Sequence, residues 1–261
     1  MPLCLKIGGP RAGYGWPVPS LALDDDTTIY FEERGSGVPV LLLAPGGMRS
    51  GIDLWANAAV DPWASYAGDF RLIAMDQRNT GRSRGPLDPA DPWGSYAADQ
   101  LAVLDHLGVD RFLVMGCCIG GSFILKLVEQ VPERVVAAVL EQPIGVHPAN
   151  RDLFTAMGRS WADDLLAGRP DLDAATVDRF LAAMWRDEFV VSVSRDVIAR
   201  CPVPLLVLPG VDDYHPTEAG RRVAALAPHA EVLEPWKDSA EHIAAATGAV
   251  REFLLGHAGR V

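Results

Sequence analysis

The segment from Val109 to Leu125 constrains the fold more than any other part of the sequence. It reads as a short apolar strand, an abrupt turn of small residues and a new helix. Such a turn stays tight only when the residues two before and two after its apex lack bulky side chains, because strand and helix backbones nearly touch there. Around Cys118 those residues are Gly116 and Gly120, so we place the apex of the turn at Cys118.

Cys117 and Cys118 also have a simpler interpretation. Two adjacent cysteines between a strand and a helix can be small buried hydrophobic residues. Burial alone, however, does not require glycines at fixed distances on both sides, and a turn centred on Cys117 would have the bulky Met115 and Ile119 at those positions. The spacing therefore favours a sharp turn at Cys118.

Apolar runs alternate with helical patterns along most of the chain. We expect an edge hairpin at 21–32, buried strands at 40–44, 70–75, 135–140 and 202–208, a short strand at 230–233, and helices near 52–67, 95–107, 216–226 and 243–255. Strands that alternate with helices predict βαβ units and a mostly parallel sheet. Residues from about 145 to 199 show helical spacing without a strand, so we expect a helical insertion there.

The pattern Gly116-x-Cys118-x-Gly120-Gly121 resembles the nucleophile elbow of the α/β-hydrolase superfamily, with sulfur in place of the usual serine oxygen. The loop from Asp76 to Ser83 is similar to the Asp-x-Arg-Gly-x-Gly-x-Ser loop of that family, with Asn79 where glycine is usual. The resemblance implies an α/β fold with a mostly parallel, doubly wound sheet, helices on both faces and a small helical cap. It divides the chain into an extended N-terminal arm (1–20), a core in two parts (21–144 and 201–261) and the cap (145–200).

A cysteine nucleophile needs an imidazole to take its proton or hold its thiolate, and a carboxylate to fix the tautomer of that imidazole. The resemblance implies the order nucleophile, acid, histidine along the chain. Asp213 lies just past the strand at 202–208 and matches the acid in the family's Gly-x-x-Asp pattern, with Asp212 as its competitor. Glu141, at the end of an earlier strand, is a second candidate, because some members of the family keep their acid there.

The base is chosen among six histidines, of which only His215 and His242 lie in loops past late strands. His215 follows Asp213 too closely to turn back onto it comfortably. His242 lies ahead of the terminal helix, where the family has its base, although Glu241 replaces the family's frequent glycine. We therefore predict a triad of Cys118, Asp213 and His242.

Chemistry on a carbonyl also needs donors aimed at the oxygen that becomes negative. One donor is the backbone N–H of Ile119, at the start of the helix after Cys118, where the helix dipole also lowers the thiol pKa. The resemblance places the other in the turn from Pro45 to Met48, with Gly47 as the expected donor and Gly46 or Met48 as alternatives.

These residues predict an enzyme that forms an acyl-cysteine on an ester, lactone or thioester and passes the acyl group to water, a hydroxyl or an amine, including intramolecular cyclisation. Sulfur leaves a tetrahedral adduct more easily than oxygen, so productive turnover favours acyl groups with good leaving groups. Two alternatives stay open. One is a cofactor-free lyase, C–C bond hydrolase or isomerase with histidine as its base, and the other is a small-ligand binder without catalysis.

Composition narrows the partners. The formal charge of −11 and the isoelectric point near 4.9 argue against nucleic acid or an anionic membrane surface. Four cysteines show neither a disulfide framework nor the spacing of a zinc site, which suits the cytoplasm. We find no nucleotide fingerprint or metal motif and expect no cofactor, so the expected partner is a small, partly apolar carbonyl compound; the oligomeric state cannot be predicted.

Overall fold

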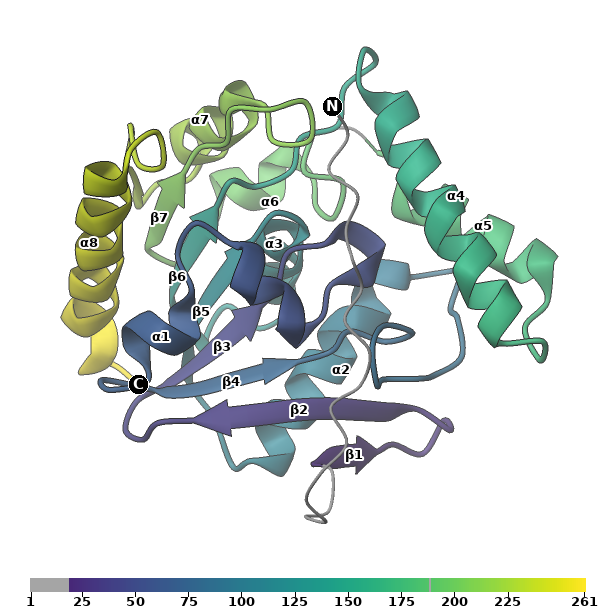
Figure 1. Cartoon of the computed structure of the whole chain (residues 1–261). Coiled ribbons are helices and arrows are strands. Elements are labelled where there is room, and N and C mark those ends of the chain that lie inside the picture. Colours follow the sequence, from purple (N-terminus) through teal and green to yellow (C-terminus); the bar gives the residue numbers. More distant parts are fainter. Residues whose placement is uncertain (1–18, 188) are drawn as a thin grey trace.

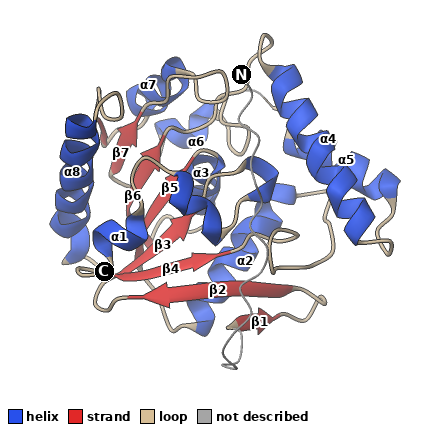
Figure 2. Cartoon of the chain, in the orientation of Figure 1, coloured by secondary structure: helices blue, strands red, loops and turns tan. Residues whose placement is uncertain are grey.

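A computed structural model describes residues 19–187 and 189–261. All but the last two residues of the predicted N-terminal arm therefore lie outside the described residues. The described chain contains an eight-stranded sheet with the order β1-β2-β4-β3-β5-β6-β7-β8 (Figure 2). The strands are β1 (Ser20–Ala22), β2 (Thr28–Arg34), β3 (Pro39–Leu43), β4 (Arg71–Met75), β5 (Phe112–Cys117), β6 (Val135–Glu141), β7 (Leu205–Leu208) and β8 (Ala230–Val232).

Six strands of this sheet, from β4 to β8 in spatial order, run parallel to one another. The hairpin of β1 and β2 is antiparallel and closes one edge, where β2 pairs with β4. Because parallel strands need crossover connections, helices lie on both faces and the strands are buried on both sides. The predicted fold class is confirmed.

Helices cover the two faces of the sheet in different sets, as Figure 1 shows. The helices that pack against the sheet are α1 (Pro62–Tyr66), α2 (Pro92–His106), α3 (Ile119–Gln130), α7 (Thr217–Leu226) and α8 (Ala240–Ala258). Alternate strand residues serve separate cores: Leu41 and Leu43 pack in the core beneath α2, α3 and α7, whereas Val40 and Leu42 pack in the core beneath α1 and α8. This division follows from the two-residue period of a strand.

Between β6 and β7 the chain forms α4 (Arg151–Gly168), α5 (Ala174–Met184) and α6 (Arg195–Ala199). Asp173 caps α5, because its side chain accepts hydrogen bonds from the backbone N–H groups of Ala175 and Thr176. Helix α4 contacts the short 3₁₀ helix η1 (Gly47–Arg49), which follows β3. Thus α4 lies directly over the turn that was expected to supply an oxyanion donor.

Among the described residues, no helix is both long enough and apolar enough to cross a lipid bilayer.

Candidate functional site

The turn between β5 and α3 has its apex at Cys118, with φ 60° and ψ −119°. A residue with a side chain rarely adopts a positive φ, and such backbone conformations persist only where the surroundings enforce them. A Cβ on Gly116 would lie 2.7 Å from the carbonyl carbon of Gly120, and a Cβ on Gly120 would lie 2.3 Å from the backbone oxygen of Leu43. The two glycines therefore permit the close approach that the spacing predicts.

His215, not His242, is the imidazole beside Cys118. The two side chains line the same cavity, and each acts directly on the pKa of the other. His215 Nε2 is buried and has no closely aligned hydrogen-bond partner among the described residues, so the contact with the thiol is looser than a fully formed hydrogen bond. Catalytic hydrogen bonds are often long before substrate binds. The geometry leaves Nε2 available to a proton from sulfur.

Asp212, not Asp213, holds the other side of this imidazole. The distance from His215 Nδ1 to Asp212 Oδ1 is 2.7 Å, and the same oxygen accepts the backbone N–H groups of Tyr214 and His215, each at 3.0 Å. A second hydrogen bond, of 3.0 Å, joins the N–H of His215 to the carbonyl oxygen of Asp212. Asp213 instead has an exposed side chain, and its carbonyl oxygen accepts a hydrogen bond from Asn150 Nδ2.

The environment favours a charged sulfur and a charged imidazole together. Burial opposes ionisation of the Cys118 thiol, but the neighbouring imidazole of His215 and its charge outweigh that effect, helped by the backbone groups of Gly46 and Ile119, so the pKa of Cys118 lies below its ordinary value. Burial lowers the pKa of His215, but the effects of Cys118 and Asp212, which raise it, are larger together. The pKa of His215 therefore lies above its ordinary value. Each of the two side chains therefore favours the charged form of the other.

The predicted role of His242 must be corrected on this geometry. His242 lies in the first turn of α8, where its Nδ1 is 3.2 Å from Asp238 Oδ1, and its side chain is 44% exposed. It does not line the cavity that contains Cys118. Because the residues between β8 and α8 place Lys237 rather than His242 toward the sheet, the structure brings no imidazole from this loop to Cys118.

Of the two expected backbone donors, Ile119 lies beside Cys118 as expected, whereas in the turn from Pro45 to Met48 Gly46 lies beside Cys118 as well as Gly47. The backbone groups of Ile119 and Gly46 lie beside Cys118 and help to lower the pKa of its thiol. Gly47 lines the same cavity, beneath the thioether of Met157. Met48 is buried in the core and its carbonyl oxygen accepts from Thr80 Oγ1, so its side chain does not line the cavity. The donor pair closest to sulfur is therefore Gly46 and Ile119, with Gly47 adjacent.

The cavity above Cys118 has a volume of about 280 Å³. Its lining is mostly apolar and comes from the β3 turn, the elbow, the end of β6, the cap and the loop after β7: Pro45, Gly46, Gly47, Cys118, Ile119, Gln142, Ile144, Phe154, Met157, Trp185, Tyr214 and His215. Phe154 and Met157 come from α4, and Trp185 follows α5. The cap thus forms the wall opposite Cys118, and the space suits a small or medium-sized apolar group.

A polar cluster lies behind this cavity, at the end of β6. Lys237 Nζ donates a hydrogen bond to Gln142 Oε1, and Gln142 Nε2 donates to Cys117 Sγ at 3.6 Å. Glu141 is fully buried, and its two carboxyl oxygens have no hydrogen-bond partner among the described residues. Burial raises the pKa of Glu141 to about 8 despite the opposing charge of Lys237. Glu141 is therefore mostly protonated at neutral pH and does not contact His215 as a triad acid would.

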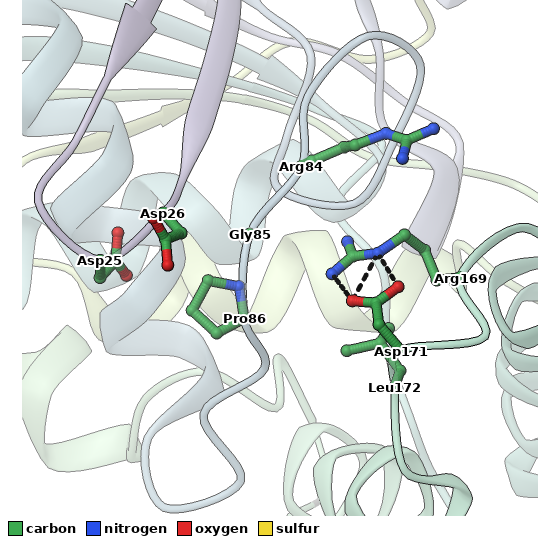
Figure 3. A pocket seen from close by; sticks show the side chains of 8 residues that line it. All are labelled: Asp25, Asp26, Arg84, Gly85, Pro86, Arg169, Asp171 and Leu172. Carbon is green, nitrogen blue, oxygen red and sulfur yellow. Dashed lines mark hydrogen bonds and ion pairs between the residues drawn. The ribbon is translucent and has the colours of Figure 1, made fainter.

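A second cavity, of about 470 Å³, lies between the β1–β2 turn, residues 84–86 and the turn after α4 (Figure 3). Its most prominent charges neutralise each other, since Arg169 forms paired hydrogen bonds with Asp171. Arg169 also donates to Asn79 Oδ1 at 3.1 Å, which links the cap to the core. In the described part of the chain, no group of three or more histidine, cysteine or acidic residues is arranged to hold a metal ion.

His215 and Asp212 were missed as a pair, although the sequence holds a signal for them. An aspartate and a histidine three residues apart can form a turn in which the aspartate side chain accepts the backbone N–H groups that follow it. A Cβ on Gly210 would lie 2.2 Å from the Cβ of His215, so the glycine allows the histidine to fold back against the strand end.

Comparison with known proteins supports the architecture. Residues 39–203 match the model of a family described as the alpha/beta hydrolase fold. The chain is 34% identical over 110 residues to a protein of Azorhizobium caulinodans named "Putative carbamate hydrolase RutD", a match that covers 42% of this chain and 39% of that protein. It is 35% identical over 116 residues to a proline iminopeptidase of Neisseria meningitidis, covering 43% and 35% of the two chains. The matches span about two fifths of the length of these curated relatives.

Solved structures resemble nearly the whole chain. The enol-lactonase from Burkholderia xenovorans has a TM-score of 0.68 at 21% identity, and the match covers 91% of this chain and 100% of the lactonase. A hydrolase from Pseudomonas aeruginosa has a TM-score of 0.66 at 23% identity, with 90% and 97% coverage. At this identity the likeness concerns the fold. Since the family model covers more than half of the sequence and the sheet has the family's architecture, the chain belongs to the alpha/beta hydrolase fold family.

Proposed function

We propose that this protein is an enzyme that forms an acyl-cysteine at Cys118 on an ester, lactone or thioester, with His215 as the base and Asp212 as the residue that orients it. The observation that carries the proposal is the meeting of the Cys118 sulfur and the His215 imidazole in one apolar cavity, with the pKa of each shifted toward the charged form. Hydrolysis, acyl transfer and cyclisation share this first step. The matched relatives include proteins named as hydrolases and a lactonase, which agrees with acyl chemistry.

In the first step the Cys118 thiolate attacks the substrate carbonyl carbon, and the electron pair of the carbonyl bond moves to oxygen. In this proposal the backbone N–H groups of Gly46 and Ile119, which line the same cavity as Cys118, donate hydrogen bonds to that oxygen. The bond to the leaving group then breaks, and the His215 imidazolium donates its proton to the departing atom. An acyl-cysteine and a neutral imidazole remain.

In the second step the neutral His215 removes a proton from water or from an acceptor hydroxyl or amine. The resulting nucleophile attacks the acyl carbon, and the bond to sulfur breaks with return of the electron pair to Cys118. The paired thiolate and imidazolium are restored. Because sulfur is a better leaving group than an alkoxide, the first step is productive only when the substrate's own leaving group departs at least as well, as from thioesters, enol lactones and activated esters.

The test is the intact mass of the protein after rapid mixing with candidate thioesters and lactones. We expect the wild type to gain the mass of the acyl group, and Cys118→Ala to gain none. Cys201→Ala is the matched control, because Cys201 is also buried but does not line the cavity. Full acylation of Cys118→Ala would end the proposal.

The same variants separate the alternative chemistry. His215 Nε2 has no closely aligned partner and could act as a simple base without an acyl-enzyme. Turnover that persists in Cys118→Ala and is lost in His215→Ala would select a lyase, C–C bond hydrolase or isomerase. Tight binding of an apolar ligand without turnover of any substrate in a broad panel would select a binding protein.

A further inference from the structure

Gln142 lines the apolar cavity, and its side-chain amide forms hydrogen bonds to residues outside that cavity. Apart from Cys118 and His215, the lining side chains with polar atoms are Gln142, Tyr214 and Trp185. The indole nitrogen of Trp185 lies toward Gly158 of α4, where a Cβ on the glycine would be 3.1 Å from it. The ring of Tyr214 packs edge-on against Phe154, with 5.4 Å between ring centroids, so it serves as part of the wall. Gln142 differs because both ends of its amide already have partners outside the cavity.

Gln142 is fixed in place by its backbone as well as by its side chain. It leaves β6 with a φ of 37°, a positive value that a residue with a side chain rarely adopts. Its N–H donates to the carbonyl oxygen of Leu208 at 2.6 Å, which ties it to the end of β7. The N–H of Cys118 donates to the carbonyl oxygen of Glu141 at 3.0 Å, so Gln142 follows directly on the residue that holds the elbow. Gln142 therefore lies close to the site of attack.

The hydrogen bonds of the Gln142 amide are unequal. Its Oε1 accepts from the ammonium group of Lys237, a strong donor, whereas its Nε2 donates to the sulfur of Cys117, a weak acceptor. A cation at the oxygen end polarises the amide and strengthens the N–H groups at the other end. A substrate oxygen would be a better acceptor than the thiol.

Lys237 is a cation without a carboxylate partner. In the described part of the chain its Nζ forms no ion pair; it donates a hydrogen bond to Gln142 Oε1 and lies 5.4 Å from the centroid of the Trp236 ring. Glu141 is the nearest buried acid, and it is mostly protonated at neutral pH. The half-buried ammonium group of Lys237 contacts Gln142 in the cavity wall, so its positive charge is only partly screened at that wall.

We propose that Gln142 and Lys237 form a subsite for an anionic oxygen, a carboxylate on the acyl part of the substrate. This inference rests on the proposed acyl-cysteine chemistry and adds to it the substrate class: short acyl groups that end in a carboxylate. The carboxylate accepts a hydrogen bond from Gln142 Nε2 and is attracted by Lys237, while the chain between the two carbonyl groups lies against the apolar wall. The closeness of Gln142 to Cys118 limits that chain to a few carbons.

The experiment compares matched substrates with the same thiol leaving group. Thioesters of malonate, succinate and glutarate half-acids are paired with neutral thioesters in which an isopropyl group replaces the carboxylate. The readout is the ratio of kcat/KM for the charged and the neutral member of each pair. We expect wild type to favour the charged member, and Lys237→Met to lower the ratio about ten- to a hundredfold, as for loss of a hydrogen bond to a charged group. Lys237→Arg should retain most of the preference.

Lys126→Met is the control, because Lys126 pairs with Glu129 on the outer side of α3 and does not line the cavity. Gln142→Leu provides a second variant if Lys237→Met fails to fold, and it should lower the same ratio. A ratio that is equal in wild type and both variants, with acyl-cysteine still formed from the neutral thioesters, would overturn this inference and leave the proposed function standing. Absence of acyl-cysteine from every thioester would instead overturn the proposed function itself.

Discussion

Both carboxyl oxygens of Glu141 are buried and meet no hydrogen-bond donor among the described residues, which makes this side chain a measurable cost to the fold. Burial disfavours the charged carboxylate and raises its pKa from 4.5 to about 8, against the opposing effect of the Lys237 charge. In the unfolded chain the carboxyl is hydrated and ionises at its ordinary pKa. The folded protein therefore keeps a proton over a pH range in which the unfolded chain has lost it.

The sign of the effect follows from that difference in bound protons. Where the folded state binds more protons, the free energy of unfolding falls as pH rises. Below pH 4.5 the group is protonated in both states and costs nothing through its charge. Between 4.5 and about 8 the stability falls steadily, and above that range the loss is complete, on the order of 5 kcal/mol from the size of the shift. Water that reaches the carboxylate in the folded state would reduce this value.

The perturbation that isolates this cost is Glu141→Gln, which keeps the shape of the side chain and cannot ionise. Urea unfolding of the wild type and of the variant is measured from pH 5 to pH 9, and the difference in unfolding free energy is plotted against pH. We expect the variant to gain on the wild type as pH rises, with most of the gain by pH 8. Glu133→Gln, at an exposed position, should show no such trend. A difference that is constant with pH would refute the account of Glu141 as a buried, unpartnered acid.

Three further outcomes test the site and the elbow. His215→Ala should lower kcat by about 10²- to 10⁴-fold, the usual contribution of a general base, whereas His242→Ala should stay near wild type; equal losses in steady-state assays would contradict the assignment. Asp212→Asn should shift the pH dependence of Cys118 alkylation toward higher pH, because it removes a charge that raises the pKa of His215, and an unshifted profile would count against its role. Gly120→Ala should destabilise the fold by several kcal/mol, because the new Cβ would lie 2.3 Å from the backbone oxygen of Leu43. Gly248→Ala is the control, since a Cβ there meets open space on α8 and should not destabilise the protein. Thermal unfolding measures the stability of both variants.

The elbow could be predicted from sequence because its constraints are local. Gly116 and Gly120 lie two residues from the apex, and the contacts that exclude a Cβ at each follow from the sharpness of the turn. The buried strands could be predicted for a similar reason, since each is a short apolar run ended by a turn. The order of strands in the sheet could not be predicted in this way, because no local pattern determines which strand lies beside which.

The imidazole beside Cys118 could not be predicted by that route, because the histidine at the family's position for the base does not reach Cys118. The resemblance directed attention to the loop before α8, where Lys237 faces Gln142 and His242 faces Asp238. His215 follows Asp213 too closely to turn back onto it. The turn closes one residue earlier, on Asp212, through backbone hydrogen bonds that the sequence does not specify uniquely.

The solvent exposure of Asp212 agrees with the proposal that the nucleophile is the sulfur of Cys118. In a serine triad the hydroxyl stays neutral until it reacts, so a buried acid is needed to stabilise the imidazolium as it forms. In the mechanism that we propose, the counter-ion of the imidazolium is the thiolate itself, because Cys118 and His215 each shift the pKa of the other toward the charged form. Asp212, whose side chain is 49% exposed, then needs only to orient the ring through Nδ1, and solvent screens much of its charge. An acid and a base on one short loop are sufficient for that task, which leaves the loop before α8 free to present Lys237.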